Sequence, residues 1–269
     1  MRKRNASSRF LAAEIEVSGV QRRNQRRAIE DAVKRWGGAI VRDGSIGPNG
    51  FEINTAPAAG DKYVQQIEEI CRALSGVGAS ADIRCGLHVH ADARDFDYFG
   101  IRRLVQIYAG IEDALFHLVP LQRRSNHYCQ PCGPVFRDAI VAGKLPHKEV
   151  KHSVMKAVYQ KEYGGASKPH ILREGKYVNS RYYALNLHSW LFRGTIECRL
   201  FPGTVKEEKI IAWGMMWARI LDWVQAHSDE EVADVLQRFS PKDCLFSVVS
   251  GSKLVDAFLI LQFADPESI

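Results

Sequence analysis

The sequence lacks the features that mark several specialised classes of protein. No apolar run approaches the ~18 residues that a membrane-spanning helix requires. The first apolar stretch, residues 10–13, ends at Glu14 and is shorter than the ~7–15 apolar residues of a secretory signal. Internal repeats and low-complexity linkers are also absent. These absences argue against fibrous and repeat architectures, and we expect a cytoplasmic protein with no membrane partner.

Cysteine use gives no sign of a disulfide framework or of a complete zinc site. Of the six cysteines, only Cys129 and Cys132 form a close Cys-x-x-Cys pair. One such pair is half of a tetrahedral zinc site, and no second pair completes it. His127 and Cys85 could be added, although their spacing does not favour it. The 46% of hydrophobic and 25% of charged residues are instead typical of a globular chain that buries a sizeable core.

Positive charge is concentrated at the start of the chain. Residues 1–36 contain ten Lys or Arg and four acidic residues, an excess that equals the net charge of +6 for the whole chain. Such a basic segment could meet nucleic acid or another polyanion. It could equally be a solvated tail followed by the exposed face of a helix.

Hydrophobic periodicity predicts alternating strands and helices. Strands are expected at residues 10–18, 39–42, 51–55, 83–91, 182–190 and 193–201. Helices are expected at residues 22–36, 62–74, 97–119 and 210–224, and through most of the remaining carboxyl-terminal segment. Two shorter helices around a polar loop in residues 121–180 could form a lid or a substrate wall. This order predicts an α+β fold, with helices packed on a mainly antiparallel sheet.

Two of the predicted helices carry an apolar stripe that should face the core. Side chains three or four positions apart share one face of a helix. The stripe residues are Leu104, Tyr108, Ile111 and Leu115 in the first helix, and Ile210, Trp213, Trp217, Ile220 and Val224 in the second.

Three predicted strands place pairs of ionisable residues on one face. Side chains alternate along a strand, so each pair shares a face while the apolar residue between its members points to the other. The pairs are Glu14 with Glu16, His88 with His90, and Glu197 with Arg199, and Glu52 adds a carboxylate from a fourth strand. Carboxylates gathered in this way repel one another unless cations hold them. The pattern therefore predicts a metal site.

The types of ligand indicate which metal is expected. Glutamate oxygens with one histidine favour Mg²⁺ or Mn²⁺, whereas zinc prefers sets rich in His and Cys. The carboxylates outnumber those that one Mg²⁺ usually takes, so two or more ions bridging nucleotide phosphates fit better. Arg199 beside Glu197 would bind phosphate through its planar fork. This arrangement is typical of phosphoryl transfer.

Several motifs in a fixed order resemble those of a known family. They are Ala13-Glu14-Ile15-Glu16, Asp43-Gly44-Ser45 followed by Gly50-Phe51-Glu52-Ile53-Asn54, Cys85-Gly86-Leu87-His88-Val89-His90, and Gly194-Thr195-Ile196-Glu197-Cys198-Arg199. Residues 124–129 and 181–186 are similar to family segments as well. The chain resembles the amidoligase family, within the superfamily of glutamine synthetase and glutamate–cysteine ligase, over roughly residues 10–225.

The resemblance implies a curved, largely antiparallel sheet with helices on its convex face. Its concave face would hold ATP and two or three Mg²⁺ ions (or Mn²⁺). The implied reaction joins a small-molecule or peptide carboxylate to an amine through an acyl phosphate. We expect a basic tail at residues 1–9, the amidoligase catalytic domain at 10–227 and a helical extension of that domain at 228–269. A polyanionic or nucleic-acid acceptor would suit the basic tail.

The resemblance also assigns roles to individual residues. One metal would be held by Glu14, His88 and Glu197, and a second by Glu16 and Glu52. The catalytic residues would be His90 and Arg199, which contact the transferred phosphoryl group, and Glu52. Nucleotide or substrate would bind to Asp43, Arg181 and Asn186, and the acceptor to Arg124, Asn126 and Tyr128.

Two other functions are compatible with the same residues. Carboxylates and histidines at two metals could cleave a phosphodiester, as in a metal-dependent phosphodiesterase or nuclease. A non-enzymatic module could instead bind nucleic acid through the basic amino-terminal segment, and its affinity would fall steeply with salt.

Overall fold

The computed structural model describes residues 7–132 and 179–267, and an open six-stranded sheet forms its centre. The strands are β1 (Leu11–Val17), β2 (Ala39–Val41), β3 (Phe51–Asn54), β4 (Gly86–Asp92), β5 (Leu185–Asn186) and β6 (Thr195–Pro202). They lie in the order β2-β3-β1-β4-β6-β5, and every neighbouring pair is antiparallel. The predicted α+β class with an antiparallel sheet is confirmed.

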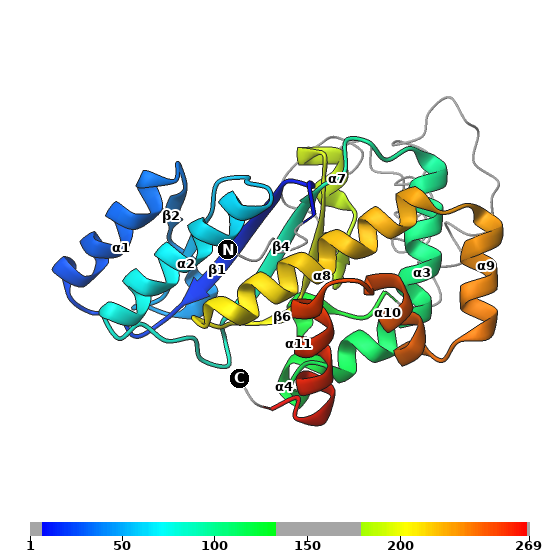
Figure 1. Cartoon of the computed structure of the whole chain (residues 1–269). Coiled ribbons are helices and arrows are strands. Elements are labelled where there is room, and N and C mark those ends of the chain that lie inside the picture. The colour runs from blue at the N-terminus through cyan, green and yellow to red at the C-terminus, as the bar shows by residue number, and fades with distance from the viewer. Residues whose placement is uncertain (1–6, 133–178, 268–269) are drawn as a thin grey trace.

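Helices cover one face of this sheet, as Figure 1 shows. The longer helices are α1 (Arg23–Arg35), α2 (Asp61–Gly76), α3 (Tyr98–His117), α8 (Glu207–Ala226), α9 (Asp229–Arg238), α10 (Pro241–Val249) and α11 (Lys253–Ala264). Short elements are α4 (Leu121–Arg124), α7 (His188–Arg193), η1 (Gly44–Ile46), η2 (His127–Cys129) and η4 (Asn179–Tyr182). Helix α8 packs on β1 and β4, and α10 and α11 pack on α8. None of the described helices is long and apolar enough to cross a membrane.

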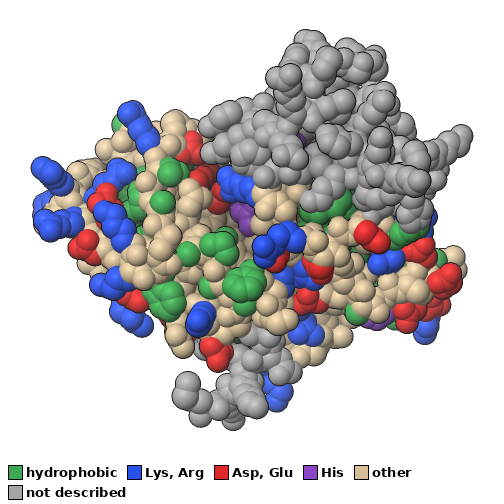
Figure 2. Space-filling model, turned by 90° about the horizontal axis from the view of Figure 1, so that it is seen from above, with side chains coloured by type: hydrophobic (Ala, Val, Ile, Leu, Met, Phe, Trp, Pro, Cys, Tyr) green, Lys and Arg blue, Asp and Glu red, His purple; other side chains and the backbone are tan. Residues whose placement is uncertain are grey.

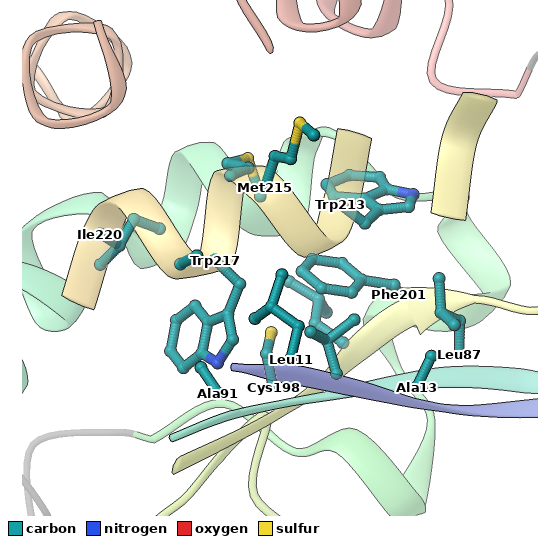
Figure 3. Packing of buried hydrophobic residues seen from close by; sticks show 14 of the residues in the cluster. Leu11, Ala13, Leu87, Ala91, Cys198, Phe201, Trp213, Met215, Trp217 and Ile220 are labelled. Carbon is teal, nitrogen blue, oxygen red and sulfur yellow. The ribbon is translucent and has the colours of Figure 1, made fainter. Parts of the chain in front are cut away.

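The main core lies between α8 and the sheet (Figure 3). The ring of Trp213 stacks on Phe201 at a centroid distance of 4.2 Å, and the indole N–H of Trp217 donates to the main-chain oxygen of Ile196 at 3.1 Å. All residues of the two predicted apolar stripes are buried. The apolar periodicity of these helices therefore predicted their inward faces correctly. On the sheet side, Cys198 points toward α8, as its position between two polar residues predicted.

The strand predicted at residues 182–190 is wrong over most of its length. Within this segment only the two residues of β5 form a strand, which pairs with β6, and α7 begins two positions after it. Asn186 Oδ1 accepts a hydrogen bond from the main-chain N–H of His188 at 3.0 Å, which starts the helical turn. Gly194 ends it in the left-handed conformation, with φ of 73°. The helix places Trp190 so that its indole N–H donates to Ala93 O at 3.0 Å, a tertiary contact that outweighs β-propensity.

The amino-terminal segment is tied to α8 from residue 7 onward. Ser7 Oγ donates to Asp222, and the guanidinium of Arg9 forms ion pairs with Asp222 and Asp95, both at 2.8 Å. Arg9 is therefore a structural cation. The rest of the predicted basic tail, and most of the predicted lid or substrate wall, lie outside the described residues.

Candidate active site

A cleft of about 1250 Å³ opens on the face of the sheet turned away from α8. It is lined by twelve of the predicted site residues, namely Glu14, Glu16, Asp43, Glu52, His88, His90, Asn126, Tyr128, Arg181, Asn186, Glu197 and Arg199. Seen from above, acidic, basic and histidine side chains gather near the middle of the molecule (Figure 2). The alternation predicted from the sequence thus places the polar members of each strand together.

Strand register brings the paired residues next to one another. Glu14 lies opposite His88 across β1 and β4, and Glu16 lies opposite Glu52 across β1 and β3. His90 lies opposite Glu197 across β4 and β6. Side chains at directly opposed positions in an antiparallel pair are neighbours on the same face. The four central strands therefore build one continuous cluster.

His88 lies between two groups of carboxylates. Its Nδ1 is 3.2 Å from Glu14 Oε2 and 3.8 Å from Glu197 Oε1. Its Nε2 is 3.9 Å from Glu16 Oε1. The two ring nitrogens thus face different carboxylates, Glu14 and Glu197 on one side and Glu16 on the other.

Two sets of ligand atoms in this cluster could each hold a metal ion. The first set is Glu14, His88 and Glu197, and the second is Glu16, Glu52 and His88. Within each set one oxygen or nitrogen from every residue lies within 4.8 Å of the others. Oxygen donors with a single imidazole suit Mg²⁺ or Mn²⁺. The donor chemistry therefore fits the ions expected from the sequence.

His90 points to a further ligand in the cleft, because one of its nitrogens is buried without a hydrogen bond among the described residues. That atom, Nε2, is 3.2 Å from Glu14 Oε1 and 3.8 Å from Glu197 Oε2, yet it is aligned with neither. Burial alone would lower the pKa of His90, but the carboxylates of Glu197 and Glu14 raise it. A buried polar atom beside carboxylates is suited to a further polar partner in the cleft.

The protein's own cations neutralise part of the carboxylate charge. Burial would raise the pKa of Glu14, but His90 and His88 hold it well below its usual value. Burial likewise opposes ionisation of Glu197, and Arg199 and His90 outweigh it and lower its pKa. The repulsion expected from the sequence is therefore partly relieved before any metal binds.

Glu52 is the exception among the carboxylates. Burial, reinforced by the charge of Glu14, raises the pKa of Glu52 to about 7. Its Oε1 accepts a hydrogen bond from the Asn54 amide at 2.9 Å, but no arginine pairs with it among the described residues. The second ligand set thus has the greater need of an added cation.

Arg199 reaches the cluster through an irregularity in β6. The register runs from Leu87 opposite Phe201 to Val89 opposite Cys198, so His88 faces two residues of β6. Such a bulge re-aims side chains. The guanidinium of Arg199 then donates to Glu197 Oε1 at 2.6 Å and to the main-chain oxygen of Tyr128 at 3.2 Å.

Arg123 supports this bulge, a role that no sequence motif predicts. Its side chain is 6% exposed, and its guanidinium donates to the main-chain oxygens of Leu200 and Arg199 at 3.0 and 2.6 Å. The neighbouring Arg124, predicted to face the acceptor, is instead placed away from the cleft. It donates to the main-chain oxygens of Val119 and His117 at the end of α3.

Three polar residues next to Glu14 and His90 were also not predicted from the sequence. Arg193 Nη1 lies 3.0 Å from Glu14 Oε1, a contact made by the last residue of α7. The hydroxyls of Ser189 and Thr195 lie 3.2 and 3.0 Å from His90 Nδ1. The sequence predicts a strand over residues 182–190, so it does not predict the helix that carries Arg193 and Ser189. Gly194 after Arg193 was the available signal, because glycine commonly ends a helix.

These features define an α+β protein with a cluster of carboxylates, imidazoles and a guanidinium in a cleft on one face of its sheet. Carboxylates, imidazoles and a guanidinium in one cleft suit the binding of divalent ions and phosphate. The chain belongs to the family described as "putative amidoligase enzyme", whose model matches residues 18–221. The family's name indicates the formation of an amide bond, which implies a carboxylate and an amine as substrates. No curated protein matches the chain.

Proposed function

We propose that this protein is an ATP-dependent carboxylate–amine ligase of the glutamine synthetase and glutamate–cysteine ligase type. The observation that carries the proposal is the presence of two ligand sets that share His88 in one cleft beside Arg199. Family membership supports the formation of an amide bond. To amide-bond formation the proposal adds ATP, two or three Mg²⁺ ions and an acyl-phosphate intermediate.

The reaction would proceed in two balanced steps. A carboxylate oxygen attacks the γ-phosphorus of ATP, and the bond to the β,γ-bridging oxygen breaks, which gives ADP and an acyl phosphate. The amine nitrogen then attacks the acyl carbon, and phosphate leaves while the nitrogen loses a proton. Divalent ions bound by the two ligand sets would neutralise the negative charge of the phosphates.

The chain's own residues would orient and stabilise the transferred group. Arg199 uses two of its N–H directions on Glu197 and the Tyr128 carbonyl, and its other N–H groups would bind phosphoryl oxygens bidentately. The Nε2 of His90 would donate to the same group, with its ring held by Ser189. The pKa of Glu52 is raised to about 7 without metal, so binding of an ion by the second ligand set would displace its proton.

A direct assay tests the proposal. Pure protein with ATP, Mg²⁺ and pools of carboxylates and amines should release ADP and phosphate in equal amounts and form an amide. Glu197→Gln is the matched control, because it keeps the size of the side chain and removes its charge. If no pool gives ADP above this control, the ligase proposal is wrong. Divalent-dependent cleavage of DNA or RNA without ATP would support the phosphodiesterase alternative instead.

The nucleic-acid-binding alternative rests on the exposed face of α1. Arg23 and Arg27 are exposed there, whereas Arg26 and Lys34 form ion pairs with Glu30, and Arg35 forms one with Glu69. Lys and Arg side chains gather at that end of the molecule in Figure 2. A helix face of this kind is common on solvated proteins. A ligase acting on a polyanionic acceptor would lose turnover as salt rises, and a salt-insensitive rate would exclude such an acceptor.

A further inference from the structure

One wall of the cleft is built from aromatic side chains. His127, Tyr128 and Tyr182 pack against one another, with ring centroids between 5.2 and 5.5 Å apart. All three line the cleft, and Tyr128 keeps 45% of its surface exposed. We call these three residues the aromatic wall. A cluster of rings that faces a cleft instead of the core offers stacking surface to a ligand.

The aromatic wall lies next to the first ligand set. Arg199 connects the two, because it donates both to the main-chain oxygen of Tyr128 and to the carboxylate of Glu197. The second ligand set extends the other way, from β1 to Glu52 on β3. A molecule whose phosphates bind at the first set and Arg199 would therefore extend along the aromatic wall.

The charges around the wall favour a flat ring on an anionic molecule over an amine. The guanidinium of Arg181 lies 5.0 Å from the ring centroid of Tyr182, and Arg199 adjoins Tyr128. None of the three wall residues is acidic, so the wall itself offers no carboxylate to an ammonium group. Asn126 Oδ1 accepts from the Tyr128 N–H at 2.8 Å, which leaves its NH₂ group to donate to a ring nitrogen.

We propose that the aromatic wall binds the purine ring of the nucleotide whose phosphates bind at Glu14, His88, Glu197 and Arg199. This inference rests on the proposed function and deepens it, since it assigns the nucleotide to the β6 side of the cleft. The carboxylate and the amine then occupy the side near β2 and η1. It differs from the sequence prediction, which placed Tyr128 at the acceptor.

Direct binding measurements test the inference. Calorimetry would compare a non-hydrolysable ATP analogue with inorganic tripolyphosphate, both with Mg²⁺, on the full chain. Tyr128→Ala should weaken binding of the analogue about 5- to 150-fold, the range expected for loss of one stacked base. Binding of tripolyphosphate should change less than about twofold, because it has no ring to stack. Tyr128→Phe should bind the analogue like the wild type, and Tyr128→Leu should resemble Tyr128→Ala.

The outcomes separate this inference from the proposed function. If the wild type binds neither compound, both proposals fall. If it binds both, and Tyr128→Ala and Tyr128→Leu bind the analogue as tightly as the wild type, only the aromatic-wall inference falls. Equal weakening of both compounds would show a structural role for Tyr128 and would also overturn the inference. A higher KM for the amine, with unchanged nucleotide binding, would place the acceptor at the wall instead.

Discussion

The guanidinium of Arg123 donates a hydrogen bond to the main-chain oxygen of Arg199 at 2.6 Å. A second bond, to Leu200 O at 3.0 Å, satisfies the next carbonyl of the bulge in β6. The side chain of Arg123 thereby holds the backbone of the bulge, and this backbone directs the side chain of Arg199 into the cleft. This relationship joins the short helix α4 to the candidate active site.

We expect Arg123→Ala to destabilise the fold strongly. It leaves two carbonyl oxygens of the bulge without their donor, and each unsatisfied buried polar group costs about 1 to 3 kcal/mol. The free energy of unfolding, measured with urea, should fall by about 2 to 6 kcal/mol. Arg124→Ala is the matched control, since its partly exposed guanidinium can be replaced by water, and it should cost less than about 1 kcal/mol. Equal losses in the two variants would contradict the role given to Arg123.

Arg199→Lys should lower kcat by about 100-fold with little change in stability, because lysine lacks the planar fork that binds two acceptors at once. The measurement is ADP release under saturating substrates. Arg94→Lys is the control, as Arg94 is an exposed surface residue paired with Asp92. Unaltered turnover in Arg199→Lys would remove this residue from the proposed phosphate site.

The stability of the metal-free protein should fall as pH rises from about 4.5 to about 7. Glu52 has a pKa of about 7 in the fold, against an ordinary value of 4.5. Between these values the folded protein keeps a proton that the unfolded chain has released, so a rise in pH favours unfolding. Glu52→Gln should therefore gain stability relative to the wild type across this window. Urea unfolding in EDTA between pH 4.5 and 8 measures the difference, and parallel curves would show that Glu52 does not titrate as described.

Addition of Mg²⁺ or Mn²⁺ should raise the melting temperature. An ion present at 100 times its Kd stabilises the folded state by about 2.7 kcal/mol. Glu52→Ala should remove much of this effect while leaving the metal-free protein as stable as the wild type or slightly more so, because close carboxylates repel without metal. Calorimetric scans with and without the ion measure both quantities. A marked loss of stability of Glu52→Ala in EDTA would show that Glu52 is structural.

Gly86→Ala should displace side chains of the carboxylate and histidine cluster. A Cβ at Gly86 would lie 2.7 Å from Arg123 Nη2 and 3.0 Å from His88 Nε2. Relief of this overlap must move one of two buried side chains, at a cost of about 1 to 3 kcal/mol, and should weaken binding of the ion as well. Gly76→Ala, where a Cβ meets nothing within 4 Å, is the control and should not destabilise. Wild-type ion affinity in Gly86→Ala would show that the site tolerates the added methyl group.

Much of the candidate site could be predicted because strand alternation is a local property. Glu14 and Glu16 share a face whatever the rest of the chain does, and an apolar Ile15 between them must turn to the core. The same reasoning placed His88 and His90. The predicted pairs do line one cleft.

Other parts of the site could not be predicted because they depend on contacts between distant segments. Nothing local distinguishes Arg123 from Arg124, and only the packing of α4 against β6 decides which one is buried. The helix that carries Ser189 and Arg193 replaces a segment with a plausible strand pattern, since its tertiary contacts outweigh propensity.

The amino-acid sequence by itself determined the alternation of ionisable and apolar residues on the strands and the apolar stripes of the helices, because both follow from backbone periodicity. The tertiary structure decided which carboxylates share His88, which arginine supports Arg199, and where the aromatic rings meet the cleft. These features depend on strand order, register and one bulge, and such long-range geometry is fixed only when the whole chain packs.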